Sequence, residues 1–291
     1  MDVLLAGLQA GAQYAILAGA LVVVFKTTGV FNFATGTLST VGVYVALTIS
    51  DLPIPAAGAV ILGCVAIGAL SVLIELVVAR PMQRRLPASG AHVVVVLLLL
   101  LMVLGEATVR LIYSSQPQSI PAKLAIEGMT TVGGVPVSKV TIVTFGSLVA
   151  ASLAGLFLLQ RTRAGITARA VAADARASEV AGVPANRFRI AAWFLSGLLA
   201  AYAGYLLANS ISIAPTMAQL PMVKAIAGVA LGGLTNLPGA IVCSVLIGVL
   251  EAIAVVHIGG WAPSVLPLVV IFVMLLVRPD GLFGTREAVR V

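Results

Sequence analysis

Charged side chains are scarce in this 291-residue sequence and account for only 9% of it. A soluble domain of ordinary composition carries about 25% charged residues, so a surface mainly in contact with water is excluded. Hydrophobic residues make up 60% of the chain, and the mean hydropathy is +1.15. Only helices or a closed barrel can span a lipid bilayer, because backbone N–H and C=O groups there need hydrogen-bond partners within the protein. Residues 93–104 lack the alternation of a barrel strand and therefore favour helices.

The sequence also lacks the residue groups that carry common enzyme chemistry. It has only two histidines, His92 and His257, and neither has a cysteine or carboxylate at metal-ligand spacing. It has no G-x-x-x-x-G-K-[ST] phosphate loop, so it does not bind ATP by that route. The two cysteines, Cys64 and Cys243, lie in apolar runs and indicate buried thiols. We therefore expect no enzyme activity, no cofactor and no metal, and any ATP would be hydrolysed by another subunit.

Basic residues outnumber acidic ones and give a formal net charge of +7. A nucleic-acid partner would require the basic residues to cluster on one solvated face. Twelve of the seventeen instead lie in three short polar stretches: Arg80, Arg84 and Arg85; Arg161, Arg163, Arg169, Arg176, Arg187 and Arg189; Arg278, Arg286 and Arg290. Cytoplasmic loops of membrane proteins carry such an excess. The three stretches are therefore predicted to be cytoplasmic, and no nucleic-acid partner is expected.

Long apolar segments predict an all-α integral membrane protein with about eight spanning helices, since about 20 residues cross the hydrocarbon core. The predicted crossings are residues 3–25, 37–50, 54–78, 91–112, 140–160, 190–208, 239–256 and 262–278. We interpret residues 1–291 as a single transmembrane domain whose N-terminus lies outside. Residues 113–139 are polar and predicted to form an extracytoplasmic loop, in which residues 124–126 and 135–137 could pair as a hairpin.

Two polar, glycine-containing segments, residues 27–37 and 231–239, interrupt apolar stretches. Irregular backbone persists at membrane depth only where protein buries it or where it lines a cavity. Interrupted segments in corresponding parts of two halves are typical of a transport site. We therefore predict re-entrant or broken helices at both places, and we leave open whether the two halves are a pseudo-repeat.

Small residues recur at spacings that favour close helix packing. Gly7 and Gly11 are four residues apart, and Gly197 and Gly204 are separated by seven. Such spacings allow helix backbones to approach each other in a membrane. They predict a compact bundle and say little about what it carries.

Three carboxylates lie within or at the edge of apolar runs, where an acid needs a partner. For Glu75 we predict a structural ion pair with Arg80, and Glu106 has Arg110 at i+4. Glu251 has no basic residue nearby in the sequence. Its role is therefore open between a structural one and a proton or substrate site.

Residues 161–189 form the most informative polar stretch. Their middle, residues 167–184, is rich in alanine and contains Gly182 and Pro184 near its end, which predicts a short helix that ends at these two residues. Such a helix between two spans can lie on the membrane surface and contact a soluble partner. A solvated connecting helix is the alternative.

Four motifs, at residues 29–36, 170–182, 224–240 and 278–284, resemble in this order those of branched-chain amino acid ABC transporter permeases. Residues 29–36, Gly-Val-Phe-Asn-Phe-Ala-Thr-Gly, resemble the Asn-Phe-Ala-His-Gly signature after the first helix of that family. Residues 170–174, with Ala177 and Gly182, resemble its cytoplasmic coupling segment. The other two are similar to its Gly-Gly-Leu-Gly-x-x-Pro-Gly-Ala element and its Arg-Pro-x-Gly-Leu-Phe-Gly tail, at residues 224–240 and 278–284.

The resemblance implies a multi-pass subunit of the bacterial inner membrane that works with other proteins. These partners are an extracytoplasmic solute-binding protein, a second homologous permease and two cytoplasmic ATPases. The implied ATPase contact comprises Arg169, Asp174, Arg176, Glu179 and Gly182. The signature histidine is Thr35 here, and the acid that often follows the signature glycine is Thr37. These departures leave urea, short amides and small carboxylates as alternatives to branched-chain amino acids.

The breaks and the resemblance together predict alternating access around a central path. The predicted path residues are Asn32, Phe33, Thr35, Gly36, Thr37, Gly232, Gly233, Thr235 and Asn236. One rival interpretation is an ion-coupled secondary transporter in which Glu251 or Glu106 binds the ion. Another is a membrane scaffold that transports nothing.

Overall fold

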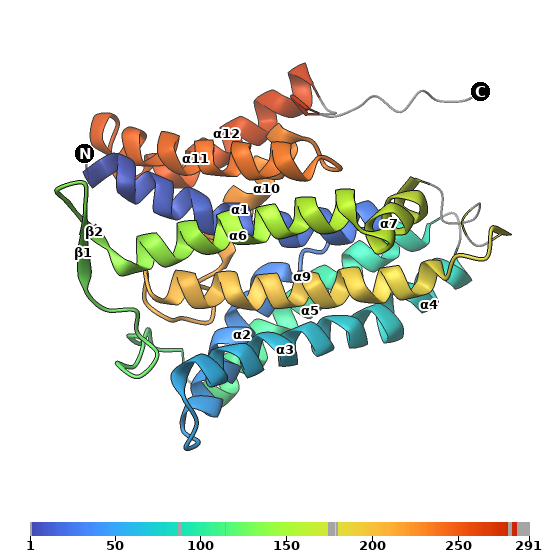
Figure 1. Cartoon of the computed structure of the whole chain (residues 1–291), viewed down its shortest axis with the longest axis horizontal. Coiled ribbons are helices and arrows are strands. Elements are labelled where there is room, and N and C mark those ends of the chain that lie inside the picture. The colour runs from blue at the N-terminus through green and yellow to red at the C-terminus, as the bar shows by residue number, and fades with distance from the viewer. Residues whose placement is uncertain are drawn as a thin grey trace.

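The computed structural model describes residues 2–86, 89–113, 115–173, 178, 180–278 and 281–283, which form a bundle of helices with one short hairpin (Figure 1). The helices are α1 (Asp2–Thr28), α2 (Thr35–Ser50), α3 (Ala56–Ile74), α4 (Arg80–Arg85), α5 (Gly90–Tyr113), α6 (Lys139–Arg161), α7 (Arg163–Ala173), α9 (Ala185–Ala208), α10 (Gln219–Gly232), α11 (Leu237–His257) and α12 (Ala262–Val277). A π-helical turn, Glu75–Ala79, joins α3 to α4. In Figure 1, α4 and α7 lie at one end of the bundle, and the N-terminus and the hairpin lie at the other.

Five helices of the described chain are long and apolar enough to cross a membrane: Val3–Thr28, Ala56–Arg85, Gly90–Tyr113, Ala185–Ala208 and Leu237–His257. Four shorter apolar helices accompany them: Thr35–Ser50, Lys139–Gly155, Gln219–Gly232 and Ala262–Met274. The chain is thus a helical integral membrane protein, and each predicted crossing falls on a helix. The structure adds α10, which the sequence analysis placed in an interrupted stretch without recognising a helix. The number of crossings stays a prediction.

The hairpin in the loop between α5 and α6 pairs β1 (Met129–Val132) with β2 (Val135–Ser138) in antiparallel register. Gly133 and Gly134 connect the strands, both with positive φ, as a tight hairpin turn requires. The prediction of a first strand at residues 124–126 is wrong. That backbone is engaged elsewhere, because the Leu124 carbonyl accepts a hydrogen bond from Tyr205 and the Ile126 N–H donates to Asn209.

Close glycine contacts hold the bundle together, as the small-residue spacings predicted. α1 packs against α9, α10 and α11. A Cβ atom added to Gly11 would lie 2.6 Å from the carbonyl oxygen of Val245 on α11. One added to Gly197 of α9 would lie 2.6 Å from the carbonyl oxygen of Ile67 on α3. These backbones approach so closely that only glycine fits at either position.

Candidate functional site

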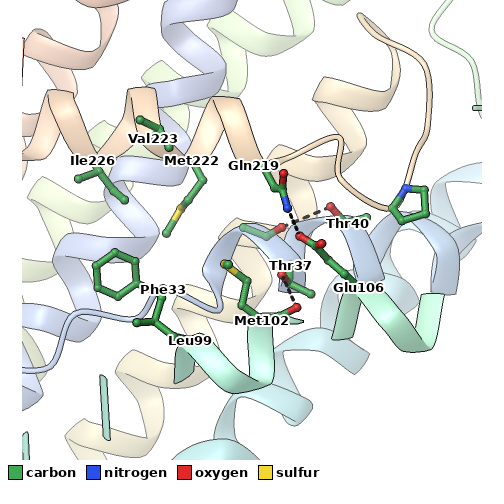
Figure 2. Close-up of a pocket in the computed structure, with 12 residues that line it drawn as sticks. Phe33, Thr37, Thr40, Leu99, Met102, Glu106, Gln219, Met222, Val223 and Ile226 are labelled. Carbon is green, nitrogen blue, oxygen red and sulfur yellow. Dashed lines mark hydrogen bonds between the residues drawn. The ribbon is translucent and has the colours of Figure 1, made fainter. Parts of the chain in front are cut away.

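A cavity of about 390 Å³ lies between the start of α2, the middle and C-terminal part of α5, and α10 (Figure 2). Its wall is mainly apolar, with a few polar groups. The lining residues are Phe33, Gly36, Thr37, Thr40, Leu99, Met102, Glu106, Pro215, Gln219, Met222, Val223 and Ile226. The α10 residues recur at i, i+3, i+4 and i+7, so they form one face of that helix. Pockets of this size, apolar with few polar groups, are typical of small-molecule sites.

The first break, predicted at residues 27–37, is a non-helical segment at residues 29–34 in the structure, and it shapes one side of this cavity. The chain leaves α1 at Gly29, which has a φ of 67°. Asn32 is completely buried, and its Oδ1 accepts a hydrogen bond from the Ala34 N–H at 3.1 Å. The Thr35 hydroxyl donates to the Asn32 carbonyl at 2.7 Å. These local hydrogen bonds replace helical ones and redirect the chain into α2, which brings Phe33 to the cavity.

Of the path residues predicted from the first break, three line the cavity: Phe33, Gly36 and Thr37. A Cβ atom on Gly36 would lie 3.1 Å from the Met222 Cβ, so α2 and α10 come close here. The Thr37 hydroxyl donates to the Met102 carbonyl of α5 at 3.3 Å. Asn32 and Thr35 are completely buried behind this surface, and their hydrogen bonds shape the turn.

The polar groups of the cavity concentrate toward the C-terminal end of α5. The Gln219 side-chain amide of α10 donates to Oε1 of Glu106 at 2.5 Å, and Figure 2 shows the two side chains pointing toward each other. The predicted partner Arg110 lies 4.0 Å from Glu106 and is half exposed. Sequence reasoning missed Gln219, because nothing in the local pattern indicates that it meets α5.

The second predicted break is arranged differently. Gly233 has a φ of 98°, which ends α10, and the Asn236 side chain accepts a hydrogen bond from the Gly239 N–H as the N-cap of α11. The Asn236 amide also donates to the Phe283 carbonyl at 2.8 Å. Gly232 packs against Gly239, and Thr235 is exposed. The structure therefore joins this break to residues 281–283, and none of its four predicted path residues lines the cavity.

Glu251 has a basic partner that sequence proximity did not reveal, so the expectation of an isolated carboxylate is corrected. Lys224 of α10 lies 2.5 Å from Oε1 of Glu251 on α11. The Tyr14 hydroxyl of α1 donates to Oε2 at 3.1 Å. These contacts join α1, α10 and α11, and they give this partly buried acid a cationic partner, which favours a structural role for Glu251.

The predicted ion pair between Glu75 and Arg80 is also corrected. Glu75 is completely buried, and its Oε1 lies 2.7 Å from Nη2 of Arg189 on α9. Arg189 also donates to Gln83 at 2.7 Å, and Gln83 donates to the Thr28 carbonyl at 3.1 Å. The prediction failed because Arg189 is far from Glu75 in the sequence, whereas folding brings α9 against α3.

The predicted ATPase-contact segment is only partly covered by the described residues. Asp174, Arg176 and Glu179 lie outside them, as does the side chain of Arg169 on α7. Gly182 is described and has a φ of 81°. The alanine-rich helix is confirmed as far as α7 extends, and its contact with an ATPase stays a prediction.

Comparison with known proteins agrees with the helical architecture and the ordered motifs. The family described as "Branched-chain amino acid transport system / permease component" matches residues 3–278. The chain belongs to this family. The sequence-based recognition, the permease function and the multi-pass membrane location are therefore confirmed. As a membrane permease subunit the chain is not itself the catalytic component, and the family implies ATPase and binding-protein partners in general terms.

The similarity to individual family members extends over almost the whole chain. The permease protein BraD of the Pseudomonas aeruginosa high-affinity branched-chain amino acid transport system is 26% identical over 98% of this chain and 96% of its own length. A probable branched-chain amino acid transport permease protein LivH from Methanocaldococcus jannaschii is 28% identical, covering 92% of this chain and 88% of that protein. PsaBC from Streptococcus pneumoniae shares the fold, with a TM-score of 0.52 and 14% identity, over 96% of this chain and 93% of that one.

Proposed function

We propose that this permease is half of a two-permease importer and conducts branched-chain or similar small amino acids through the α2–α5–α10 cavity. The observation that carries the proposal is the pairing of an apolar wall with one carboxylate, Glu106, in the same cavity. An amino acid has a matching pattern, with an apolar side chain and a cationic ammonium group. Leu99, Met222 and Ile226 suit the side chain, and Glu106 suits the ammonium group.

The same electrostatics separates this cargo from its alternatives. A small carboxylate and an amino acid both carry a negative carboxylate, but only the amino acid also has an ammonium group that can pair with Glu106 and offset this repulsion. Urea and short amides lack the positive charge that would pair with Glu106, and they lack the apolar side chain that the cavity wall would bury. The branched-chain amino acid therefore fits the cavity better than the other substrates that the sequence left open.

Transport in this proposal requires the contact between α5 and α10 to open. Glu106 and Gln219 bridge the two helices at the outer part of the cavity. A loaded binding protein docks on the outer face, and two partner ATPases act through the segment 161–189 at the opposite face. The substrate ammonium then replaces Gln219 as the partner of Glu106. Rearrangement of residues 29–34 and of α10 passes the substrate inward.

Of the two carboxylates named for the rival secondary transporter, Glu251 is a poor ion site, because Lys224 already lies 2.5 Å from its Oε1. Glu106 remains open to a cation, so the driving force of transport has to separate the two interpretations. The complex reconstituted in vesicles should accumulate leucine with ATP and binding protein when all ion gradients are collapsed by ionophores. Accumulation that needs an ion gradient and no ATP would overturn the importer proposal.

The test of the cavity is the Glu106→Gln variant of the reconstituted complex. Loss of a hydrogen bond to a charged group costs about 1.5–3 kcal/mol, so leucine uptake should fall at least tenfold. ATP hydrolysis stimulated by the loaded binding protein should persist. Glu127→Gln is the matched control, because Glu127 is an exposed carboxylate of the outer loop and lies outside the cavity. Normal leucine uptake by Glu106→Gln would rule out the proposed contact.

A further inference from the structure

A second hollow, separate from the cavity, lies between α1, α6, α9 and α11, with α7 at one end. It is a groove of about 390 Å³ with an almost entirely apolar wall. The residues that keep it open are small or short, and include Gly19, Ala151, Gly155 and Ala192. The hydroxyl of Thr27, at one end, donates to the Val23 carbonyl at 3.1 Å within α1. This polar group of the wall is therefore satisfied by the protein itself.

The groove has the length of a lipid leaflet. It follows α1 from Ala15 to Thr27, which is about 18 Å at about 1.5 Å per residue. One leaflet occupies half of a hydrocarbon core about 30 Å thick. Along α9 the groove runs from Leu199 to Phe188, and Phe188 lies at the same end as Thr27 and the α7 residue Ala168. The groove thus extends from mid-membrane to the end of the bundle that carries α7 (Figure 1).

Three of the helices that form the groove carry an exposed cation at this same end. Lys26 lies in the last turn of α1, Arg161 ends α6, and Arg187 lies in the first turn of α9. All three side chains are exposed. The ion pairs found in the described part of the chain involve other basic residues: Arg110, Arg189 and Lys224. This end is the one predicted to face the cytoplasm.

We propose that the groove binds one acyl chain of an anionic phospholipid of the inner leaflet, with its phosphate among Lys26, Arg161 and Arg187. The apolar wall matches the chain, and the three cations match the headgroup. Lysine and arginine stems can lie along apolar surface while their charged ends reach the interface. The site depends on the membrane location of the chain and not on the proposed cargo.

The test measures lipid binding to the full-length protein in its complex by native mass spectrometry. The complex is delipidated in mild detergent and titrated with phosphatidylglycerol or with phosphatidylcholine of the same acyl chains. We expect tighter binding of phosphatidylglycerol. In a Lys26→Gln, Arg161→Gln, Arg187→Gln variant this preference should disappear, with a loss of about fivefold per cation removed.

A substitution that fills the groove tests the acyl-chain part of the site. A Cβ atom on Gly155 meets nothing within 4 Å, so Gly155→Leu should fold normally while it occupies the groove. Gly146 on the same helix is equally open and lies outside the groove, which makes Gly146→Leu the matched control. Gly155→Leu should reduce phosphatidylglycerol binding at least tenfold, and Gly146→Leu should leave it unchanged.

Three results would overturn the proposal: equal affinity of the unmodified protein for the two lipids, undiminished binding by Gly155→Leu, and a different occupant in native membranes. The last is tested by cross-linking with phosphatidylglycerol that carries a photoactivatable acyl chain. Cross-links from this lipid to α6 and α9 are expected. Failure of the lipid to cross-link there, together with cross-links from a photoreactive residue at position 155 to another protein chain, would identify a protein occupant instead.

Discussion

Arg189 of α9 forms a 2.7 Å ion pair with the completely buried Glu75 of the π-helical turn after α3. The same guanidinium donates to Gln83, which in turn contacts the Thr28 carbonyl at the end of α1. Arg189 and Gln83 thus connect the start of α9, which follows the predicted ATPase contact, to the end of α1, which precedes the break at residues 29–34. A movement of α9 would therefore displace the start of this break.

The first prediction concerns this pair. Arg189→Met should destabilise the protein by about 3–5 kcal/mol, because it leaves Glu75 charged and buried without its partner. Arg189→Met combined with Glu75→Gln should recover part of the loss. The difference in stability is measured as the shift in unfolding temperature in detergent, with size-exclusion chromatography as the readout of the protein that remains folded. Arg84→Met removes an exposed arginine from α4 and should unfold like the unmodified protein. Equal stability of the single and double variants would show that the pair is not the cause.

The second prediction concerns Lys224 and Glu251. Lys224→Met should abolish most leucine uptake, because it leaves Glu251 without its cationic partner and removes an ion pair that fixes the position of α10, and with it the cavity face, against α11. Exchanging the two residues, Lys224→Glu with Glu251→Lys, should restore part of the uptake by re-forming the pair. Uptake in reconstituted vesicles is the measurement. If the exchange variant folds but shows no more uptake than Lys224→Met, Glu251 has a role beyond holding α10.

The third prediction concerns helix packing at Gly197. Gly197→Ala should destabilise the protein by about 1–3 kcal/mol, because the added methyl group would lie 2.6 Å from the Ile67 carbonyl oxygen. Gly146→Ala adds the same group where nothing lies within 4 Å, and should be neutral or slightly stabilising. Unfolding temperatures of the two variants make the comparison. Similar unfolding temperatures of the two variants would mean that α3 and α9 can move apart at no cost in folding free energy.

The fourth prediction distinguishes the two breaks. Asn32→Ala removes the side-chain acceptor that holds the Ala34 N–H, whereas Asn32→Ser can keep it. Leucine uptake should fall severalfold in the alanine variant and be largely retained in the serine variant. Asn236→Ala removes an N-cap away from the cavity, at a cost of about 1 kcal/mol in stability. Leucine uptake by Asn236→Ala should fall less than uptake by Asn32→Ala. A larger fall would indicate that the second break also lines the substrate path.

The outer hairpin illustrates the limit of local sequence patterns. Its turn at Gly133-Gly134 and its second strand were predictable, because positive φ at two adjacent positions is a local property of glycine. Its first strand was not, because residues 124–126 have the composition of a strand but make their hydrogen bonds with α9 and its C-terminal end. Register depends on such competing partners, which the local pattern does not contain.

The sequence by itself determined the membrane class, the positions of most helices and the two breaks, and its four ordered motifs indicated the family. The structural features follow from local physics, since an apolar segment must satisfy its own backbone hydrogen bonds and glycine-rich segments interrupt that pattern. Only the tertiary structure decided which groups meet: Arg189 with Glu75, Lys224 with Glu251, and Gln219 with Glu106. It also placed the first break beside the cavity and the second beside residues 281–283. The reason is that these contacts join different helices, and their geometry depends on how the whole bundle packs.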